Sequence, residues 1–122
     1  MAETIRISPD GTHIRISSAG PPSLGEMAQT LSKLVELRLD RGIDKVLVDS
    51  RARSGQPPVP DIYRGGEMLA QKLGPGTRIA VLVGQVEDGH SLFEDVAVNR
   101  GAVVAFFQDE ALALRWLLEN ER

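Results

Sequence analysis

The 122-residue sequence contains no cysteine. A disulfide framework, a thiolate nucleophile and a cysteine-based zinc site are therefore excluded. Its 14 basic and 17 acidic residues give a net charge of -3, and the arginines are scattered along the chain without forming a basic stripe. This distribution argues against nucleic acid as a partner, because such proteins concentrate positive charge on one face.

Long hydrophobic stretches are missing as well. Residues 1–8 alternate polar and apolar side chains and contain neither the apolar core of a secretion signal nor a membrane span. We therefore expect a cytoplasmic protein that does not cross a membrane. The length corresponds to a single domain over residues 1–122, large enough to bury a core without disulfides or structural metal.

Short apolar runs predict the sheet. Residues 78–83 and 102–107 are two such runs, each followed by a helical pattern, and tandem units of this kind are typical of a parallel sheet with helices on its faces. Residues 45–50 predict a further buried strand. Residues 4–8 and 12–17 alternate with period two around a Pro-Asp-Gly turn, which predicts an antiparallel hairpin.

Helical spacing of apolar residues predicts four helices between and after these strands. We expect the helices to be capped or opened by four polar residues, Ser23, Asp61, Ser91 and Asp109. Glycines mark the ends of the first three helices, near residues 42, 74 and 101. The predicted fold class is therefore α/β, in the order ββαβαβαβα, with helices packed on a mixed, mostly parallel sheet.

Four segments carry a family resemblance: residues 45–49 and 78–83, the stretch 93–107, and residues 113–117. In these segments the sequence resembles the SpoIIAA-like branch of the STAS fold, small bacterial proteins related in fold to anti-sigma-factor antagonists and CRAL-TRIO lipid carriers. The resemblance covers most of the chain and rests mainly on core patterns. For an anti-sigma-factor antagonist it would imply a phosphorylated serine before the second helix, where this sequence offers only Ser54 beside Pro57 and Pro58.

The loop after the third strand is the expected binding region, because ligands of open α/β sheets bind outside the carboxyl ends of the strands. The candidate ligand-binding residues are Asp49, Arg51, Arg53, Ser54, Tyr63, Arg64, Gly65 and Gly66. The three arginines could hold an anion at the start of the second helix, where the helix dipole favours negative charge. The alternative is a solvated loop with local ion pairs, such as Asp61 with Arg64.

Two adjacent glycines, Gly65 and Gly66, interrupt the second helix, and each costs about 1 kcal/mol relative to alanine. Close packing of the helix backbone is the favoured explanation. The alternative is a cavity kept open for an apolar ligand, as the resemblance to lipid carriers allows.

The spacing of residues does not predict a catalytic set, a cofactor site or a metal site. Glu87 and His90 are close in sequence, but turn and cap roles explain them better than a metal or an acid–base pair. A triad of Ser50 or Ser54 with His90 and Asp49 lacks the elbow that would position a nucleophile. We therefore expect a protein that is not an enzyme.

The final helix suggests a partner surface. Leu112 and Trp116 lie off its main apolar stripe, and Leu37 is a similar outlier on the first helix. These three residues are the candidate interface of a homodimer, although Trp116 could instead fold over the sheet edge. The leading hypothesis is a non-enzymatic STAS-like binding or regulatory module with a protein partner. The alternative is a carrier or sensor of a small apolar or acidic, lipid-like ligand near residues 49–64.

Overall fold

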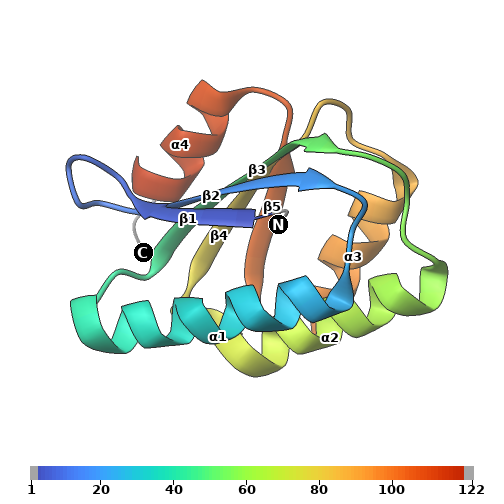
Figure 1. Ribbon diagram of the computed structural model, residues 1–122, viewed down its shortest axis with the longest axis horizontal. Helices are drawn as coiled ribbons and strands as arrows, with labels where there is room; N and C mark the ends of the chain where they lie inside the picture. Colours follow the sequence, from blue (N-terminus) through green and yellow to red (C-terminus); the bar gives the residue numbers. More distant parts are fainter. Residues whose placement is uncertain (1–2, 120–122) are drawn as a thin grey trace.

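The computed structural model describes residues 3–119. Within that range the chain forms five strands, four α-helices and one short 3-10 helix (Figure 1). Their bounds are β1 Glu3–Ile7, β2 Ile14–Gly20, α1 Leu24–Arg41, β3 Lys45–Arg53, α2 Val59–Leu73, η1 Gly74–Gly76, β4 Arg78–Leu82, α3 Asp88–Asn99, β5 Val103–Phe107 and α4 Glu110–Glu119. The predicted order ββαβαβαβα is confirmed.

The five strands form one sheet in the order β1-β2-β3-β4-β5. β1 and β2 pair in antiparallel fashion, and the other neighbours pair in parallel. Helices α1, α2 and α3 lie on one side of the sheet, whereas α4 lies alone on the other (Figure 1). The mixed, mostly parallel sheet with helices on its faces is therefore confirmed.

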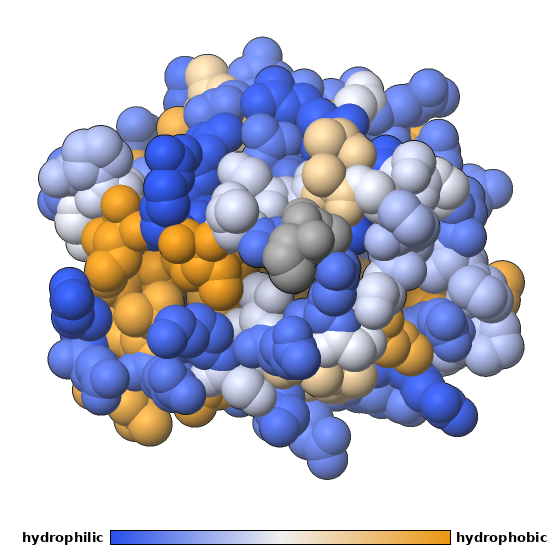
Figure 2. Space-filling view, viewed as in Figure 1, coloured by the Kyte–Doolittle hydropathy of each residue, from blue (hydrophilic) through white to orange (hydrophobic). Residues whose placement is uncertain are grey.

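The two faces of the sheet carry separate hydrophobic cores, because successive side chains of a strand point to opposite faces. Val46 of β3 belongs to the larger core, which the sheet forms with α1, α2 and α3. Its neighbour Leu47 belongs to the smaller core under α4, together with Ala80, Ala113 and Leu117, all of which are completely buried. Figure 2 shows that apolar side chains also reach the surface between the sheet and the C-terminal half of α1.

Strand β3 is longer than the sequence predicts. A register shift between Ser17 and Ala19 of β2 lets the pairing continue, so that Ala19 lies opposite Ala52 and Gly20 opposite Arg53. β3 therefore continues past residue 50, and the loop before α2 shrinks from residues 51–60 to residues 54–58. Helix α2 begins two residues earlier than expected, at Val59, because a proline in the first helical turn loses no intrahelical hydrogen bond.

Helix α3 also begins earlier than predicted. Glu87 rather than Ser91 is its N-cap, and Glu87 and His90 form a reciprocal capping box. The N-cap roles of Ser23 and Asp109 are confirmed, because Ser23 Oγ accepts the Glu26 N–H at 3.2 Å and Asp109 Oδ1 accepts the Leu112 N–H at 3.1 Å. Among residues 3–119, no helix combines the length and apolar character needed to cross a membrane.

Candidate functional site

A cavity of about 630 Å³ lies between the sheet and the layer of helices α1, α2 and α3. It reaches the segments that follow β3 and β4, where Gln56 and Gly84 form part of its wall. Its volume falls within the range of sites that enclose small molecules. The cavity therefore occupies the position where ligands of parallel sheets usually bind.

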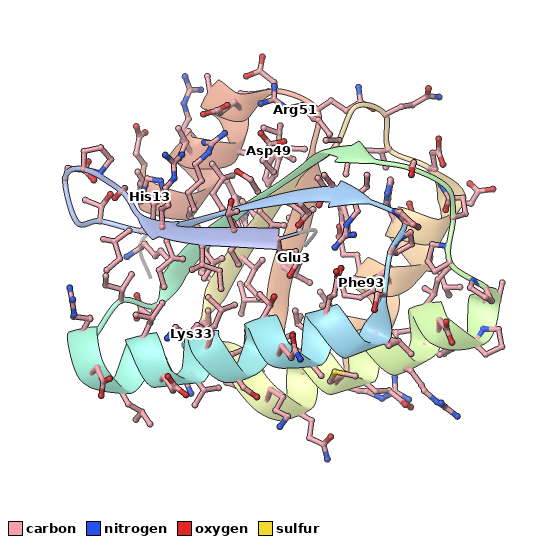
Figure 3. All side chains as sticks on the ribbon, viewed as in Figure 1. Glu3, His13, Lys33, Asp49, Arg51 and Phe93 are labelled. Atoms are coloured by element: carbon pink, nitrogen blue, oxygen red, sulfur yellow. The ribbon has the colours of Figure 1, made fainter. Side chains whose placement is uncertain are left out.

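Apolar side chains form most of the inner wall. Those contributed by the sheet are Ile16, Val48, Ile79, Val81, Val104 and Phe106, and those contributed by the helices include Leu31, Ile62, Leu69 and Phe93. Phe93 meets the edge of Phe106 at a ring-centroid distance of 6.0 Å. In Figure 3, Phe93 lies on the side of the sheet covered by α1, α2 and α3. The interior can therefore accept an alkyl or aromatic group, but not a buried charge.

His90 forms part of the same wall through two contacts that fix its ring. Its imidazole stacks on Phe106 at a centroid distance of 5.0 Å, and its Nδ1 accepts the Glu87 N–H at 3.0 Å. Because Nδ1 is an acceptor, the neutral ring carries its proton on Nε2. Burial lowers the pKa of His90 below 6.5, which favours this neutral form. His90 therefore offers an uncharged N–H donor at the cavity wall.

The structure does not bring the three predicted arginines together. Arg53 donates to Glu3 at 2.7 Å and to the carbonyl oxygens of Ala19 and Pro21 at 3.1 and 2.9 Å. It also lies 3.6 Å from Glu26. The side chain of Arg53 is only 18% exposed, so this arginine ties β1 and β2 to the start of α1. Its charge is already balanced by protein carboxylates.

Arg51 is directed elsewhere. Its guanidinium donates to Asp49 at 2.8 Å and lies 3.5 Å from Glu110 of α4. Arg15 joins the same cluster, at 3.1 Å from Asp49 and 2.9 Å from Glu110. Figure 3 shows Asp49 and Arg51 on the α4 side of the sheet, away from Phe93. The prediction that Arg51 and Arg53 share one anion site is therefore wrong. Three residue steps of β3, from Asp49 to Ala52, lie opposite two steps of β2, and this bulge breaks the side-chain alternation that would otherwise direct both arginines to the same face.

The remaining loop candidates are scattered. Ser54 and Arg64 are exposed, and Tyr63 is 45% exposed on α2. The predicted pair of Asp61 with Arg64 is not among the ion pairs formed within residues 3–119. Of the eight predicted residues, those that contribute to the cavity wall are Arg51, Arg53 and Gly65.

The two adjacent glycines of α2 have different surroundings. A Cβ on Gly66 would lie 2.8 Å from Val96 Cγ1 and 3.2 Å from the backbone nitrogen of Ala97. Close packing of α2 on α3 therefore explains Gly66. A Cβ on Gly65 would instead meet the ring of Phe93 at 3.0 Å and the sulfur of Met27 at 3.4 Å, and Gly65 lies in the cavity wall.

Two of the three predicted interface residues pack within the chain, and the third is exposed. Leu37 packs against the larger core. Trp116 contacts Phe107 at a centroid distance of 5.5 Å, and the Arg78 guanidinium lies 3.9 Å from its ring centroid. These two residues thus have partners within the chain, and Trp116 folds against edge strand β5 as the alternative reading expects. Leu112 is 51% exposed.

Sequence reasoning missed Ser50 and Phe106 as cavity residues and assigned His90 only a local role. Phe106 lies in a recognised apolar run, but nothing in that run tells which of two adjacent phenylalanines faces α3. Ser50 follows Val48 at the two-residue spacing of a strand, and this signal would have placed it on the same face had the strand been extended past residue 50.

Comparison with solved structures identifies the fold. The structure matches an uncharacterised protein of the DUF3478 family with a SpoIIAA-like fold from Shewanella loihica PV-4, with a TM-score of 0.61. The alignment covers 95% of this chain and 92% of that protein, at 23% sequence identity. No protein-family model matches the sequence, and no curated protein matches it either. The chain therefore has a SpoIIAA-like fold, as the sequence resemblance predicts.

Proposed function

We propose that the protein is a non-enzymatic binding module that carries or senses a small, mainly apolar molecule. The observation that carries this proposal is the cavity of about 630 Å³ between the sheet and helices α1 to α3. A fold alone does not define a function, so the proposal depends on this site. The relation of the fold to CRAL-TRIO lipid carriers, inferred from the sequence, is additional support.

The energetics favour an alkyl chain as the buried group. Each buried methylene contributes about 0.8 kcal/mol, so eight methylenes supply roughly 6 kcal/mol before the entropic cost of binding. Since roughly 6 kcal/mol corresponds to a dissociation constant of about 40 μM, a ligand of this size should bind in the range of tens of micromolar or weaker, with a few polar contacts offsetting part of the entropic cost. A regulatory role follows if the occupied and empty forms present different surfaces to a protein partner.

The first experiment is native mass spectrometry of gently purified protein, because one spectrum reports both a retained small molecule and the subunit count. Thermal unfolding with 1-decanol then tests binding directly. We expect 1-decanol to raise the melting temperature of the wild type by several degrees. Val81→Phe, which fills the cavity, should abolish that shift, whereas Leu112→Phe on the exposed side of α4 should keep it.

Two results would contradict the proposal together. One is a spectrum that contains only the bare polypeptide. The other is the absence of a thermal shift with every alkyl probe in wild-type protein of confirmed fold. If the bare polypeptide is dimeric, the alternative of a regulatory module acting through its surface gains support, and Leu112 is the first residue to test at the interface.

A further inference from the structure

We propose that the cavity selects a ligand whose polar end is uncharged, such as the hydroxyl of an alkyl alcohol, over the corresponding carboxylate or ammonium. This inference rests on the proposed function and specifies its ligand class. It departs from the acidic ligand that the sequence suggests. Three features of the cavity wall support the inference: arginines that are paired with protein carboxylates, acidic groups, and two neutral hydrogen-bonding groups.

The arginines of the wall are already used by the protein. Arg53 is held by Glu3 and by two backbone carbonyls, and Arg51 is held by Asp49 on the other face of the sheet. Moving the Arg53 guanidinium to a ligand carboxylate would leave the largely buried Glu3 without its charged partner, which is costly. Moving Arg51 would break its ion pair with Asp49, which would then keep Arg15 alone. A ligand carboxylate would therefore enter an apolar cavity with no free cation to balance it.

The acidic groups of the wall act against an anion as well. Glu3, Asp61 and Glu87 all line the cavity. Two of these carboxylates are engaged, because Glu3 accepts from Ser18, Thr30 and Arg53, and Glu87 accepts from Gln56 and caps α3. An ammonium group thus finds its strongest acceptors occupied, and its burial costs desolvation energy that one remaining carboxylate repays only in part.

Two neutral groups remain for the ligand. Ser50 lies on the cavity side of β3, two residues beyond Val48, and its hydroxyl has no hydrogen-bond partner among residues 3–119. His90 is fixed with Nδ1 as an acceptor, so Nε2–H is its donor. A hydroxyl group donates and accepts, and it therefore suits a serine and a neutral histidine without bringing charge into the cavity.

The test compares three probes of equal chain length, 1-decanol, decanoate and decylammonium, by titration calorimetry at pH 7.5 and constant ionic strength. We expect 1-decanol to bind at least ten times more tightly than either charged probe. Equal or tighter binding of decanoate or decylammonium would overturn the inference and leave the proposed function standing. If none of the three binds, the proposed function itself fails.

A variant tests the role of Ser50. Ser50→Ala should weaken the binding of 1-decanol severalfold, because a hydrogen bond in an apolar site is lost. The matched control is Ser32→Ala, which removes an exposed hydroxyl from α1 and should leave the affinity unchanged. Unchanged affinity in Ser50→Ala, with the fold confirmed by circular dichroism, would overturn the assignment of Ser50 as the ligand's partner.

Discussion

The guanidinium of Arg53 lies 2.7 Å from the carboxylate of Glu3, which joins the end of β3 to the beginning of β1. Both side chains are largely buried, at 18% and 14% exposure. The pair lies beside the cavity, at the edge of the sheet. Arg53, which the sequence offers as a cation for a ligand, therefore serves to hold β3 and β1 together. Removing the Arg53 side chain should therefore lower the free energy of unfolding as well as change the net charge.

Replacing Arg53 tests this structural role. Arg53→Gln leaves Glu3 without its charged partner, and we expect the free energy of unfolding to fall by about 2 kcal/mol, since loss of one member of a buried pair is costly. Lys33→Gln is the control, because Lys33 and Glu36 form an exposed pair on α1 and should change stability by less than about 0.5 kcal/mol. Urea unfolding measures the free energy of unfolding of both variants. Equal losses of stability in Arg53→Gln and Lys33→Gln would contradict the structural role of Arg53.

Gly66 should tolerate no side chain. Gly66→Ala places a Cβ 2.8 Å from Val96 and 3.2 Å from a backbone nitrogen of α3, so we expect a loss of about 1–3 kcal/mol through overpacking. Gly25→Ala on α1 is the matched control, since its Cβ would meet an ordinary contact at 3.7 Å and alanine favours the helix. Chemical denaturation of both variants provides the comparison, and a stabilised Gly66→Ala variant would contradict close packing.

The two histidines should make stability depend on pH. Burial lowers the pKa of His13 and of His90 below 6.5. Between these lowered values and 6.5, the unfolded chain binds more protons than the folded one, so stability is complete above pH 6.5 and decreases as the pH falls below it. NMR titration of the two imidazoles in the folded protein is the direct measurement. Values at or above 6.5 would show that the rings are not buried in neutral form.

Asp49 should stabilise the contact between the sheet and α4 in its ionised form. Hydrogen bonding by Arg51 is the largest cause that lowers the pKa of Asp49 below 3.8. The contribution is therefore complete above pH 3.8 and is lost as the pH falls towards the lowered value. We expect Asp49→Asn to cost about 1 kcal/mol at pH 7, because both Arg15 and Arg51 lose an ionised partner.

The measurement for Asp49→Asn is urea unfolding at pH 7 and again at pH 2.5, where the difference from the wild type should shrink. Glu36→Gln, in the exposed pair on α1, serves as the reference for a carboxylate with little effect on stability. A difference that is as large in acid as at neutral pH would mean that the asparagine side chain disturbs packing and that charge is not the cause.

The order of the elements could be predicted because apolar runs, caps and turns are local signals. Residues 78–83 and 102–107 were recognisable as strands from their composition alone. The end of β3 was not, because Arg51 and Arg53 are polar and their pairing depends on the shifted register of β2. Local patterns contain no information on such long-range pairing, so the loop appeared longer than it is.

The candidate site was predicted less well for the same reason. The sequence places several arginines near the carboxyl end of a strand, but it does not show that Glu3 and Glu110, distant in sequence, neutralise them. The glycines of α2 were the more informative signal. Two glycines in one helix lower its stability, so their presence indicated that the surroundings leave no room for side chains. In the structure Gly66 packs against α3 and Gly65 lies in the cavity wall.

The contact at Gly66 also bears on how a ligand would enter. Since α2 lies against α3 with no room for a single methyl group at Gly66, these two helices cannot separate without breaking this close contact. The segment 54–58 joins β3 to α2 beside the cavity and is held more loosely: its residues are mostly exposed, and it is tied down by hydrogen bonds from Ser54 N–H to the Gly20 carbonyl and from Gln56 to Glu87. Association rates should therefore be set by the opening of this connection, with α2 and α3 moving together as one wall.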